Sequence, residues 1–481
     1  MSKENFIPYV EELPIPFDPV GIFSTFCEYP NSFFLDSSMN EFHSGQFSFM
    51  GFSPFLIYKS WGDEIKVRED NKTTLHKGNP FFYLQEYLKQ YSFKRIPELP
   101  PFQGGAVGYF GYDMGHFVEK FDAITQEDLP IPDCYICFYS TVIIFDHRRE
   151  KIWISSLGKS KDGIKKAKET IKELKSFIIS LYQSKPVFSR DYVPITYNFT
   201  SNFTKKKYLE AIIKAKEYIA AGDIYQVNFS QRFSLPCDIP PFDLYLRLRK
   251  INPAPFSAFL NFDEVKILSS SPERFLRISN DSVETRPIKG TRPRSSDFLK
   301  DRKLALELLK SEKDKAELIM IVDLERNDLG KVCKYGSVRV PDLLVLETYS
   351  YVYHLVSTIR GVLYQGKDHI SCLKACFPGG SITGAPKIRS MEIIEELEPI
   401  RRKVYTGSIG YIGFNRETDL NIAIRTVLLL NGNAYFQTGG GIVADSDPEA
   451  EYNETLFKAR AMFSALNNEK KLNLETLPQI S

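Results

Sequence analysis

Apolar residues recur along this chain in two patterns, one typical of β-strands and one typical of helices. In the first 180 residues, short aromatic-rich runs indicate strands. These runs are FSFMGFSPFLIY at 47–58, YICFYSTVIIF at 135–145 and KIWISSL at 151–157. A lysine-rich helix is expected near 160–182, and the polar, proline-containing sequence at 181–200 is typical of a linker.

The second half of the chain has clearer helix and strand boundaries. Thr204 can cap a helix over 205–221, and Gly222 can end it. The segment IYQVNFSQRF at 224–233 alternates as a strand does, so its even-numbered residues, Gln226 among them, share one face. Further strands are expected at 265–271, 284–290, 407–414, 422–430 and 433–443, and helices near 298–326, 385–397 and 448–465.

Strands and helices mixed in this way predict an α+β fold in which long apolar strands form large sheets. The chain has 481 residues, more than a single hydrophobic core usually serves. We therefore expect separate regions along the sequence. They are an N-terminal lobe at 1–180, a linker at 181–200, a main domain at 201–468 and a C-terminal tail at 469–481.

Composition and charge narrow the function classes. Hydrophobic residues make up 43% of the chain and charged residues 25%, which is the balance of a soluble globular protein. The formal net charge is +2, so nothing predicts nucleic acid or an anionic membrane as a partner. The N-terminal sequence lacks a basic segment followed by an apolar one, and no apolar run approaches the roughly 18–20 residues that span a bilayer. We therefore expect a cytoplasmic protein.

The seven cysteines are scattered, which favours reduced thiols. Cys134 and Cys137 form a CxxC pair, and Cys372 and Cys376 form a CxxxC pair. The two pairs lie far apart in sequence, whereas zinc sites need four ligands at close spacing. Buried thiols are the better interpretation.

One helical segment places a carboxylate where a metal ion could bind. In DKAELIMIVDLERND at 314–328, Glu317 has helical spacing with Met320, Ile321 and Leu324, which predicts an apolar, inward-looking face. A buried carboxylate needs a cation, a hydrogen-bond network or a metal. The alternative is a structural salt bridge or a helix-end glutamate at the surface.

A second acidic group occurs in PEAEYNETLFKA at 448–459. Glu451 and Glu454 are three residues apart, and Glu454 and Lys458 are four apart, which is also the spacing of a common surface pair. The preceding glycine run in QTGGGIVADSD would let backbone amides approach a ligand closely. Oxygen ligands from two helices suit Mg²⁺, which often keeps waters and takes ligands from its substrate.

Glycine-rich segments add a candidate anion site. FPGGSITGAPKIRSMEII at 377–394 opens a helix, and free amides there attract anions. Two nucleotide interpretations fail. The stretch from Gly379 to Gly384 has P-loop spacing without the Lys-Ser/Thr that should follow, and the stretch from Gly439 to Ala444 is separated from its helix by Asp-Ser-Asp-Pro. A small carboxylate is the better candidate.

Glu273, Lys289 and His354 are candidates for catalysis. Glu273 follows a strand in SSSPERF, where burial would raise its pKa and make it an acid; a surface glutamate is the alternative. His354 lies in an aromatic and β-branched run and is either a packed core residue or a base.

Lys289 lies in ETRPIKGTRPR at 284–294, where Pro287 indicates a sheet edge or a bulge. Gly290 beside it would allow a substrate to approach closely. Three neighbouring cations, Arg286, Arg292 and Arg294, would lower the pKa of Lys289 and leave a neutral amine as a nucleophile. The alternative is a lysine that joins a basic anion-binding patch.

Nine of these segments occur in the order of a known enzyme family. They are GDIYQVNFSQRF, SPERF, ETRPIKGTRPR, DKAELIMIVDLERNDLGKV, HLVST, FPGGSITGAPKIRSMEII, GSIGY, NIAIRT and GGGIVADSDPEAEYNETLFKA. The segments resemble the chorismate-utilising enzymes, which include anthranilate synthase and aminodeoxychorismate synthase large subunits and isochorismate and salicylate synthases. The resemblance implies the fold of anthranilate synthase component I, a large β-sandwich with surrounding helices and a cleft active site, with chorismate bound by residues 201–468.

The resemblance also implies roles for individual residues. Glu317 and Glu454 would bind Mg²⁺, which holds the ring carboxylate of chorismate, with Glu451 in support. Glu273 would be the acid that assists loss of the C4 hydroxyl. The groups expected to hold or line the substrate are Gln226, Gly290, Thr291, His354, Tyr411, Arg425, Lys458 and the amides of Gly439 and Gly441.

Two positions discriminate within the family. Isochorismate and salicylate synthases carry a water-activating lysine where this chain has Gln226, which favours ammonia as the nucleophile. Anthranilate synthases carry alanine in PIAGT, where this chain has Lys289 in PIKGT, the mark of the aminodeoxychorismate branch. There the lysine would attack C2 as the C4 hydroxyl leaves, and ammonia would enter at C4. Anthranilate synthase stays the alternative because His354 matches the histidine that those enzymes use in pyruvate loss.

The resemblance implies a partner and a second pocket. The sequence shows no glutaminase segment, so a separate glutamine amidotransferase subunit would supply ammonia. The family's first lobe holds a tryptophan pocket, for which Ser37, Pro255, Phe256 and Ser257 are the candidates here. The segment FFLDSSM departs from the family's LLES-like sequence, which leaves open whether tryptophan regulates this chain.

Overall fold

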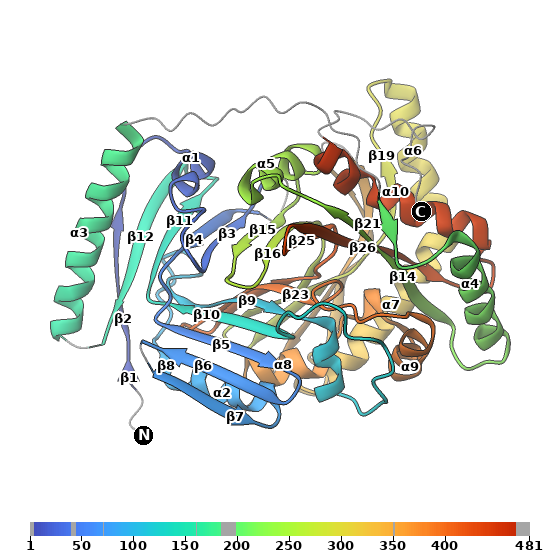
Figure 1. Ribbon diagram of the computed structural model, residues 1–481, viewed down its shortest axis with the longest axis horizontal. Helices are drawn as coiled ribbons and strands as arrows, with labels where there is room; N and C mark the ends of the chain where they lie inside the picture. The colour runs from blue at the N-terminus through green and yellow to red at the C-terminus, as the bar shows by residue number, and fades with distance from the viewer. Residues whose placement is uncertain are drawn as a thin grey trace.

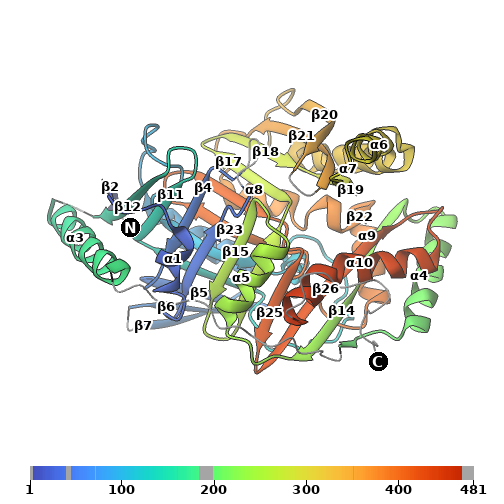
Figure 2. The same ribbon diagram turned by 90° about the horizontal axis from the view of Figure 1, so that it is seen from above.

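Two large β-sheets packed face to face form the centre of the protein, and helices cover both outer faces (Figures 1 and 2). The computed structural model describes residues 4–39, 45–70, 72–159, 161–183, 199–349 and 352–467. The arrangement confirms the α+β fold with a large sandwich.

Sheet I has 12 strands, and its strands β3, β4, β11, β15 and β16 lie above β5, β9 and β10 of the other sheet in Figure 1. Its order is β13 (Thr200–Ser201), β14 (Gln226–Pro236), β26 (Asn433–Ile442), β25 (Thr426–Leu430), β16 (Lys266–Ser271), β15 (Phe256–Asn261), β3 (Ser32–Asp36), β4 (Phe47–Gly51), β11 (Thr141–Asp146), β12 (Lys151–Gly158) and β2 (Ile7–Glu12). The short strand β22 (Gly384–Ala385) pairs with β14.

Sheet II also has 12 strands. Its order is β19 (Ile288–Pro293), β21 (Val352–Val362), β18 (Ser282–Arg286), β17 (Arg274–Ser279), β24 (Glu417–Asn421), β23 (Ser408–Gly413), β9 (Gly105–Phe110), β10 (Cys134–Tyr139), β5 (Leu56–Trp61), β6 (Glu64–Glu69) and β7 (Lys72–Lys77). Strand β20 (Arg339–Thr348) pairs with β21, and β1 (Glu4–Asn5) forms a separate pair with β8 (Tyr91–Ser92).

Three hydrophobic clusters hold these layers together. The cluster between the sheets includes Phe33 and Ile144 from sheet I and Val107 and Tyr135 from sheet II. The outer face of sheet I packs against α1 (Pro19–Ser24), α3 (Lys161–Gln183), α4 (Lys205–Ala220), α5 (Pro241–Ile251) and α10 (Pro448–Asn467). The outer face of sheet II packs against α2 (Pro80–Lys89), α6 (Phe298–Lys310), α7 (Glu312–Gly330) and α8 (His369–Cys376). The remaining helices are α9 (Lys387–Leu397), η1 (Tyr112–Phe117) and η2 (Gly380–Ile382).

Strands from the two halves of the chain pair within both sheets. Strand β3 pairs with β15 in sheet I, and β9 pairs with β23 in sheet II. The expected division into lobes stays a prediction, but any boundary near residue 200 crosses both sheets. Most of the expected linker and the whole C-terminal tail at 469–481 lie outside the described residues.

Several expected elements divide where a turn intervenes. The helix expected near 298–326 is two helices, because Ser311 ends α6 and its hydroxyl caps α7 by accepting a hydrogen bond from the Asp314 amide. The run at 284–290 is two strands separated at Pro287, and β19 lies at the edge of sheet II as the proline predicts. The cap of α4 is confirmed, since Thr204 accepts from the Lys207 amide at 3.3 Å.

The seven cysteines are free, and five of them, including all members of the CxxC and CxxxC pairs, are buried. The expectation of buried thiols is confirmed. None of the helices in the described part of the chain is long and apolar enough to cross a membrane.

Candidate active site

The candidate site residues come from both sheets and from two helices that pack on them. Strand β19 at the edge of sheet II carries Lys289, and α7 packs on it with Glu317. Strand β26 of sheet I carries the glycine run, and α10 packs on it with Glu451 and Glu454. The fold therefore brings together segments that are far apart in the sequence (Figure 2, where α7, β19, α10 and β26 lie on the same side).

Strand β19 has a bulge directly after Lys289. Lys289 pairs with Leu355 and Thr291 pairs with His354, so the register shifts at Gly290. Gly290 has φ of +72°, a conformation that residues with a Cβ rarely adopt. A Cβ there would come within 2.7 Å of Leu308 and 2.9 Å of the Asp314 carboxyl carbon. The glycine is required for the close packing of β19 against α6 and α7.

Lys289 lies near three carboxylates that come from different elements. Its ammonium group lowers the pKa of Glu273, Glu317 and Glu454, in each case against the effect of burial. Within the described residues, Lys289 has neither an ion pair nor a side-chain hydrogen bond. Its amine is thus available to a ligand.

The three arginines expected to act on Lys289 form ion pairs in the structure. Arg286 pairs with Glu347, Arg292 pairs with Glu307 and Asp314, and Arg294 pairs with Asp301. Each arginine is paired with at least one carboxylate, and the effect expected of the three cations on Lys289 stays a prediction.

Three carboxylates from α7 and α10 form the candidate metal site. Burial raises the pKa of Glu317 and of Glu451. Burial has the same effect on Glu454, but the Lys458 ammonium at 2.7 Å lowers its pKa overall. The side chains of Glu451 and Glu454 lie over Gly440, where a Cβ would be 3.2 Å from one oxygen and 3.6 Å from the other.

This donor set fits Mg²⁺. All the donors are carboxylate oxygens, which are the ligands that this ion prefers. Burial disfavours these negative charges, and a divalent cation would offset that cost. Gly440 leaves the space above β26 open, and any larger residue would crowd the carboxylates.

Glu273 lies near a second buried acid, Glu325. Glu273 is only 5% exposed, and burial raises its pKa, although the Ser381 hydroxyl and Lys289 oppose the shift. Burial also raises the pKa of Glu325 to about 8, with Glu273 contributing, and Thr285 donates a hydrogen bond to it at 2.8 Å. Burial thus favours the protonated form of both acids, and a raised pKa suits Glu273 for proton donation.

His354 and Arg425 line a cavity of about 50 Å³ together with Pro255, Asn252 and Tyr349. Thr291 Oγ1 lies 2.9 Å from His354 Nδ1. Burial and the nearby Arg425 lower the pKa of His354 to about 3, so the imidazole is neutral. Arg425 donates to Asn252 at 2.9 Å and has no carboxylate partner in the described part of the chain. An unpaired, largely buried guanidinium in a cavity suits the carboxylate of a ligand.

Gln226 lies beside the glycine run of β26. Gln226 is fully buried on β14, and its amide nitrogen would lie 2.9 Å from a Cβ at Gly441. Neither its oxygen nor its nitrogen has a partner among the described residues. Gly439 accepts a hydrogen bond from Lys458 at 2.9 Å. These contacts connect β14, β26 and α10 at one point.

Tyr411 lies away from this group. Its ring packs on Phe49 and Phe102, and it lines a cavity of about 130 Å³ between the sheets. All four residues expected for the second pocket, Ser37, Pro255, Phe256 and Ser257, line the same cavity. We expected Tyr411 to hold a substrate carboxylate, and that role stays a prediction, although β23 directs this residue into the sandwich.

Sequence reasoning missed Glu325 and Lys313. Glu325 follows Glu317 by eight residues on α7 and is more buried than Glu317, so helical spacing could have found it. Lys313 precedes Glu317 by one helical turn, and its ammonium lies 4.0 Å from that carboxylate. The apolar pattern predicted that Met320 and Leu324 face inward, but both are only half-buried.

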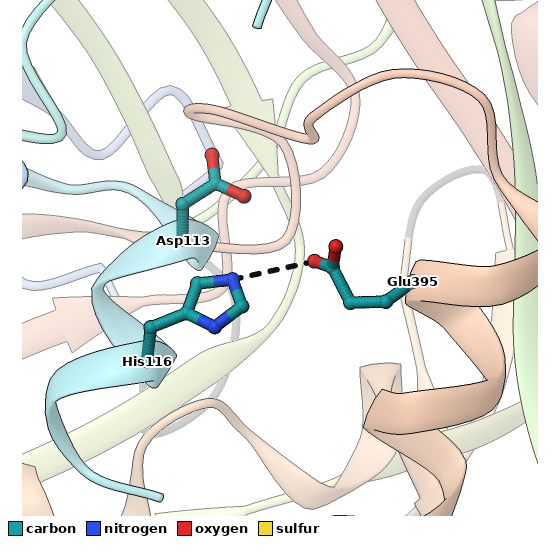
Figure 3. Close-up of side chains that lie close together, drawn as sticks. All are labelled: Asp113, His116 and Glu395. Carbon is teal, nitrogen blue, oxygen red and sulfur yellow. Dashed lines mark ion pairs between the residues drawn. The ribbon is translucent and has the colours of Figure 1, made fainter. Parts of the chain in front are cut away.

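A separate charged cluster joins η1 to α9 (Figure 3). His116 Nε2 lies 3.3 Å from Glu395, and Thr125 donates to the same carboxylate through its amide and hydroxyl. Burial would raise the pKa of Glu395, but these hydrogen bonds lower it to about 2. Burial and Asp133 raise the pKa of Asp113 to about 7. Both oxygens of Glu395 already face donors, so we assign the cluster a structural role.

The chain is similar to known proteins along most of its length. A family model described as chorismate binding enzyme matches residues 33–464. The chain is 40% identical over 423 residues to aminodeoxychorismate synthase component 1 of Bacillus subtilis (strain 168), covering 88% of this chain and 89% of that protein. It is 38% identical over 480 residues to anthranilate synthase component 1 of Acetivibrio thermocellus, covering 97% and 96%.

A solved structure extends the similarity to the fold. The crystal structure of anthranilate synthase component I from Streptococcus pneumoniae TIGR4 matches with a TM-score of 0.77 at 33% identity, covering 88% of this chain and 93% of that one. The two kinds of relative are almost equally similar in sequence, so overall identity does not separate their reactions.

Proposed function

Because the chain belongs to the family of chorismate-binding enzymes, we propose that it aminates chorismate at C4 and releases 4-amino-4-deoxychorismate. The observation that carries the proposal is the position of Lys289. Its amine has no partner in the described residues and acts on the candidate acid Glu273 and on the metal-binding carboxylates Glu317 and Glu454. A ligand held by those carboxylates would present its ring to this amine.

In the proposed first step the Lys289 amine attacks C2 of chorismate. The ring double bonds shift, and the C4 hydroxyl leaves as water with a proton from Glu273, while the lysine nitrogen gives up one proton. Ammonia then attacks C4, the double bonds shift back, and the bond between C2 and Lys289 breaks. The lysine regains a proton as the ammonia nitrogen loses one, so chorismate and ammonia give aminodeoxychorismate and water.

Other side chains would hold the substrate. Glu317, Glu451 and Glu454 would hold Mg²⁺, which supplies a Lewis acid for the ring carboxylate. Arg425, which lacks a carboxylate partner in the described residues, would take a second carboxylate in the cavity beside His354. The amide of Gln226 occupies the position of the lysine that activates water in other branches, which supports ammonia as the nucleophile.

We also propose a glutamine amidotransferase subunit as the source of ammonia, because the sequence has no glutaminase motif of its own. The cavity lined by Ser37 and Phe256 is proposed to bind tryptophan. The same cavity contains charged groups of both signs, including Arg277 and Asp419, which suit the two ends of a free amino acid.

Anthranilate synthesis is the second candidate, and His354 is the observation that favours it. The imidazole is neutral, is oriented by Thr291 and shares a cavity with Arg425. A neutral imidazole so placed can remove a proton, as pyruvate loss and aromatisation require. Near-equal similarity to anthranilate synthases is compatible with this alternative.

Product identity separates the two reactions. The purified chain would be incubated with chorismate, Mg²⁺ and ammonium at mildly alkaline pH, with and without an added aminodeoxychorismate lyase. We expect 4-aminobenzoate that depends on the lyase. Anthranilate fluorescence without the lyase would favour the second candidate instead.

A further inference from the structure

Lys313 lies between the candidate metal-binding carboxylates of two helices. Its Nζ is 4.0 Å from Glu317 on α7 and 3.9 Å from Glu451 on α10. It also lowers the pKa of Glu454. One ammonium group on the first turn of α7 therefore acts on all three carboxylates of the candidate metal site.

Ammonium groups already act on the three carboxylates without a metal ion. Glu317, Glu451 and Glu454 contribute three negative charges, and Lys289, Lys313 and Lys458 are the cations that act on them. The ammonium groups would repel a divalent cation bound to the same carboxylates. Mg²⁺ would therefore bind more tightly if one of the lysines moved away.

Lys313 is the lysine that can withdraw at least cost. Lys458 is held by Glu454 at 2.7 Å and by the Gly439 carbonyl at 2.9 Å. Lys289 projects from a bulged strand that is packed against two helices. The Lys313 side chain is 57% exposed, and its two ion pairs are at the long limit for such contacts.

We propose that Lys313 is a positioning residue that takes the place of Mg²⁺ between Glu317 and Glu451 and competes with the metal for them. When no metal is bound, its positive charge offsets the repulsion between the carboxylates. The same charge weakens the affinity of the site for Mg²⁺. The proposal rests on the metal site of the proposed function.

The test is titration of Mg²⁺ into the full chain by calorimetry, without chorismate, at pH 8 and low ionic strength. Lys313→Gln should bind Mg²⁺ about threefold to tenfold more tightly than the wild type, because an exposed ion pair of this kind has a modest energy. Lys313→Arg, which keeps the charge, should stay within about twofold of the wild type. The gain in Lys313→Gln should shrink in 0.5 M KCl, where charge interactions are screened.

Lys315→Gln is the matched control. It removes the same charge from the same turn of α7, but Lys315 pairs with Glu312 at 2.9 Å and does not contact the three carboxylates. Equal Mg²⁺ affinity in the wild type and Lys313→Gln would overturn the proposal, as would equal tightening in Lys315→Gln. Absence of Mg²⁺ binding in every variant would instead refute the metal site of the proposed function, and the competition with it.

Discussion

At the scale of single residues, the chemistry depends on where a charge is left without a partner. Lys289 and Arg425 are the two cations of the candidate site that lack a carboxylate partner among the described residues, and both suit a dicarboxylate ligand. The identity of Lys289 could be predicted from the sequence. Its surroundings could not, because the pairing of three neighbouring arginines depends on Glu347, Asp301 and Asp314 from later elements.

Glu325 is the buried acid whose charge state should affect stability. Its pKa is raised from 4.5 to about 8 by burial, so the folded protein keeps a proton that the unfolded chain releases above about pH 4.5. Its contribution is therefore most favourable at low pH and is lost as the pH rises toward 8. Glu325→Gln keeps an acceptor for Thr285 and removes the ionisation.

We predict that Glu325→Gln gains stability relative to the wild type between pH 5.5 and pH 9. The gain should be about 3 kcal/mol in the free energy of unfolding, measured by urea denaturation at both pH values. Asp323→Asn is the control, since Asp323 lies on the exposed side of the same helix. If the free energy of unfolding of Glu325→Gln differed from that of the wild type by the same amount at both pH values, the buried ionisation would be contradicted.

At the scale of elements, the bulge of β19 determines where Lys289 can reach. Gly290 combines a left-handed φ with tight contacts to Leu308 and Asp314. We predict that Gly290→Ala lowers the free energy of unfolding by about 2–4 kcal/mol, because strain and overpacking add. It should also reduce turnover, since the Lys289 amine would shift.

Gly336→Ala separates the effect of backbone strain from the effect of overpacking. Gly336 has the same φ of +72°, but a Cβ there meets nothing within 4 Å. This variant should lose only the strain, about 1 kcal/mol. Equal losses of stability in the two variants would show that packing against α6 and α7 does not matter.

The elements themselves were largely predictable, and their boundaries less so. Thr204 and Gly222 identify the ends of α4 because capping is local chemistry. The break between α6 and α7 at Ser311 was missed, although residues 310–315 carry no apolar side chain and serine is a common N-cap residue. The inward face of α7 was misjudged by part of a turn, since Glu325 and Asp328 are buried beside Thr285 and Lys387 while Met320 is half-buried.

At the scale of the whole molecule, the two halves of the chain complete each other's sheets. Strand β15 pairs with β3, and β23 pairs with β9, through the middle of the sandwich. Pairing between distant segments depends on tertiary context and is not visible in local periodicity. For the same reason, Tyr411 was expected at the substrate and lies between the sheets.

We predict that residues 199–467 do not fold as an independent unit. Without β3 and β9, strands β15 and β23 would become exposed edges lined with core residues, which favours aggregation. Size-exclusion chromatography and thermal unfolding of this fragment would check the prediction. A monomeric fragment with a cooperative unfolding transition would contradict it.

The central claim is that Lys289 directs nitrogen to C4 of chorismate, and product partition in Lys289→Ala tests it most directly. The variant and the wild type would receive chorismate, Mg²⁺ and ammonium, and 4-aminobenzoate formed with added lyase would be measured beside anthranilate. We predict that the variant loses aminodeoxychorismate formation by on the order of 100-fold or more, with any remaining amination at C2. Unchanged formation of aminodeoxychorismate by Lys289→Ala would contradict the account.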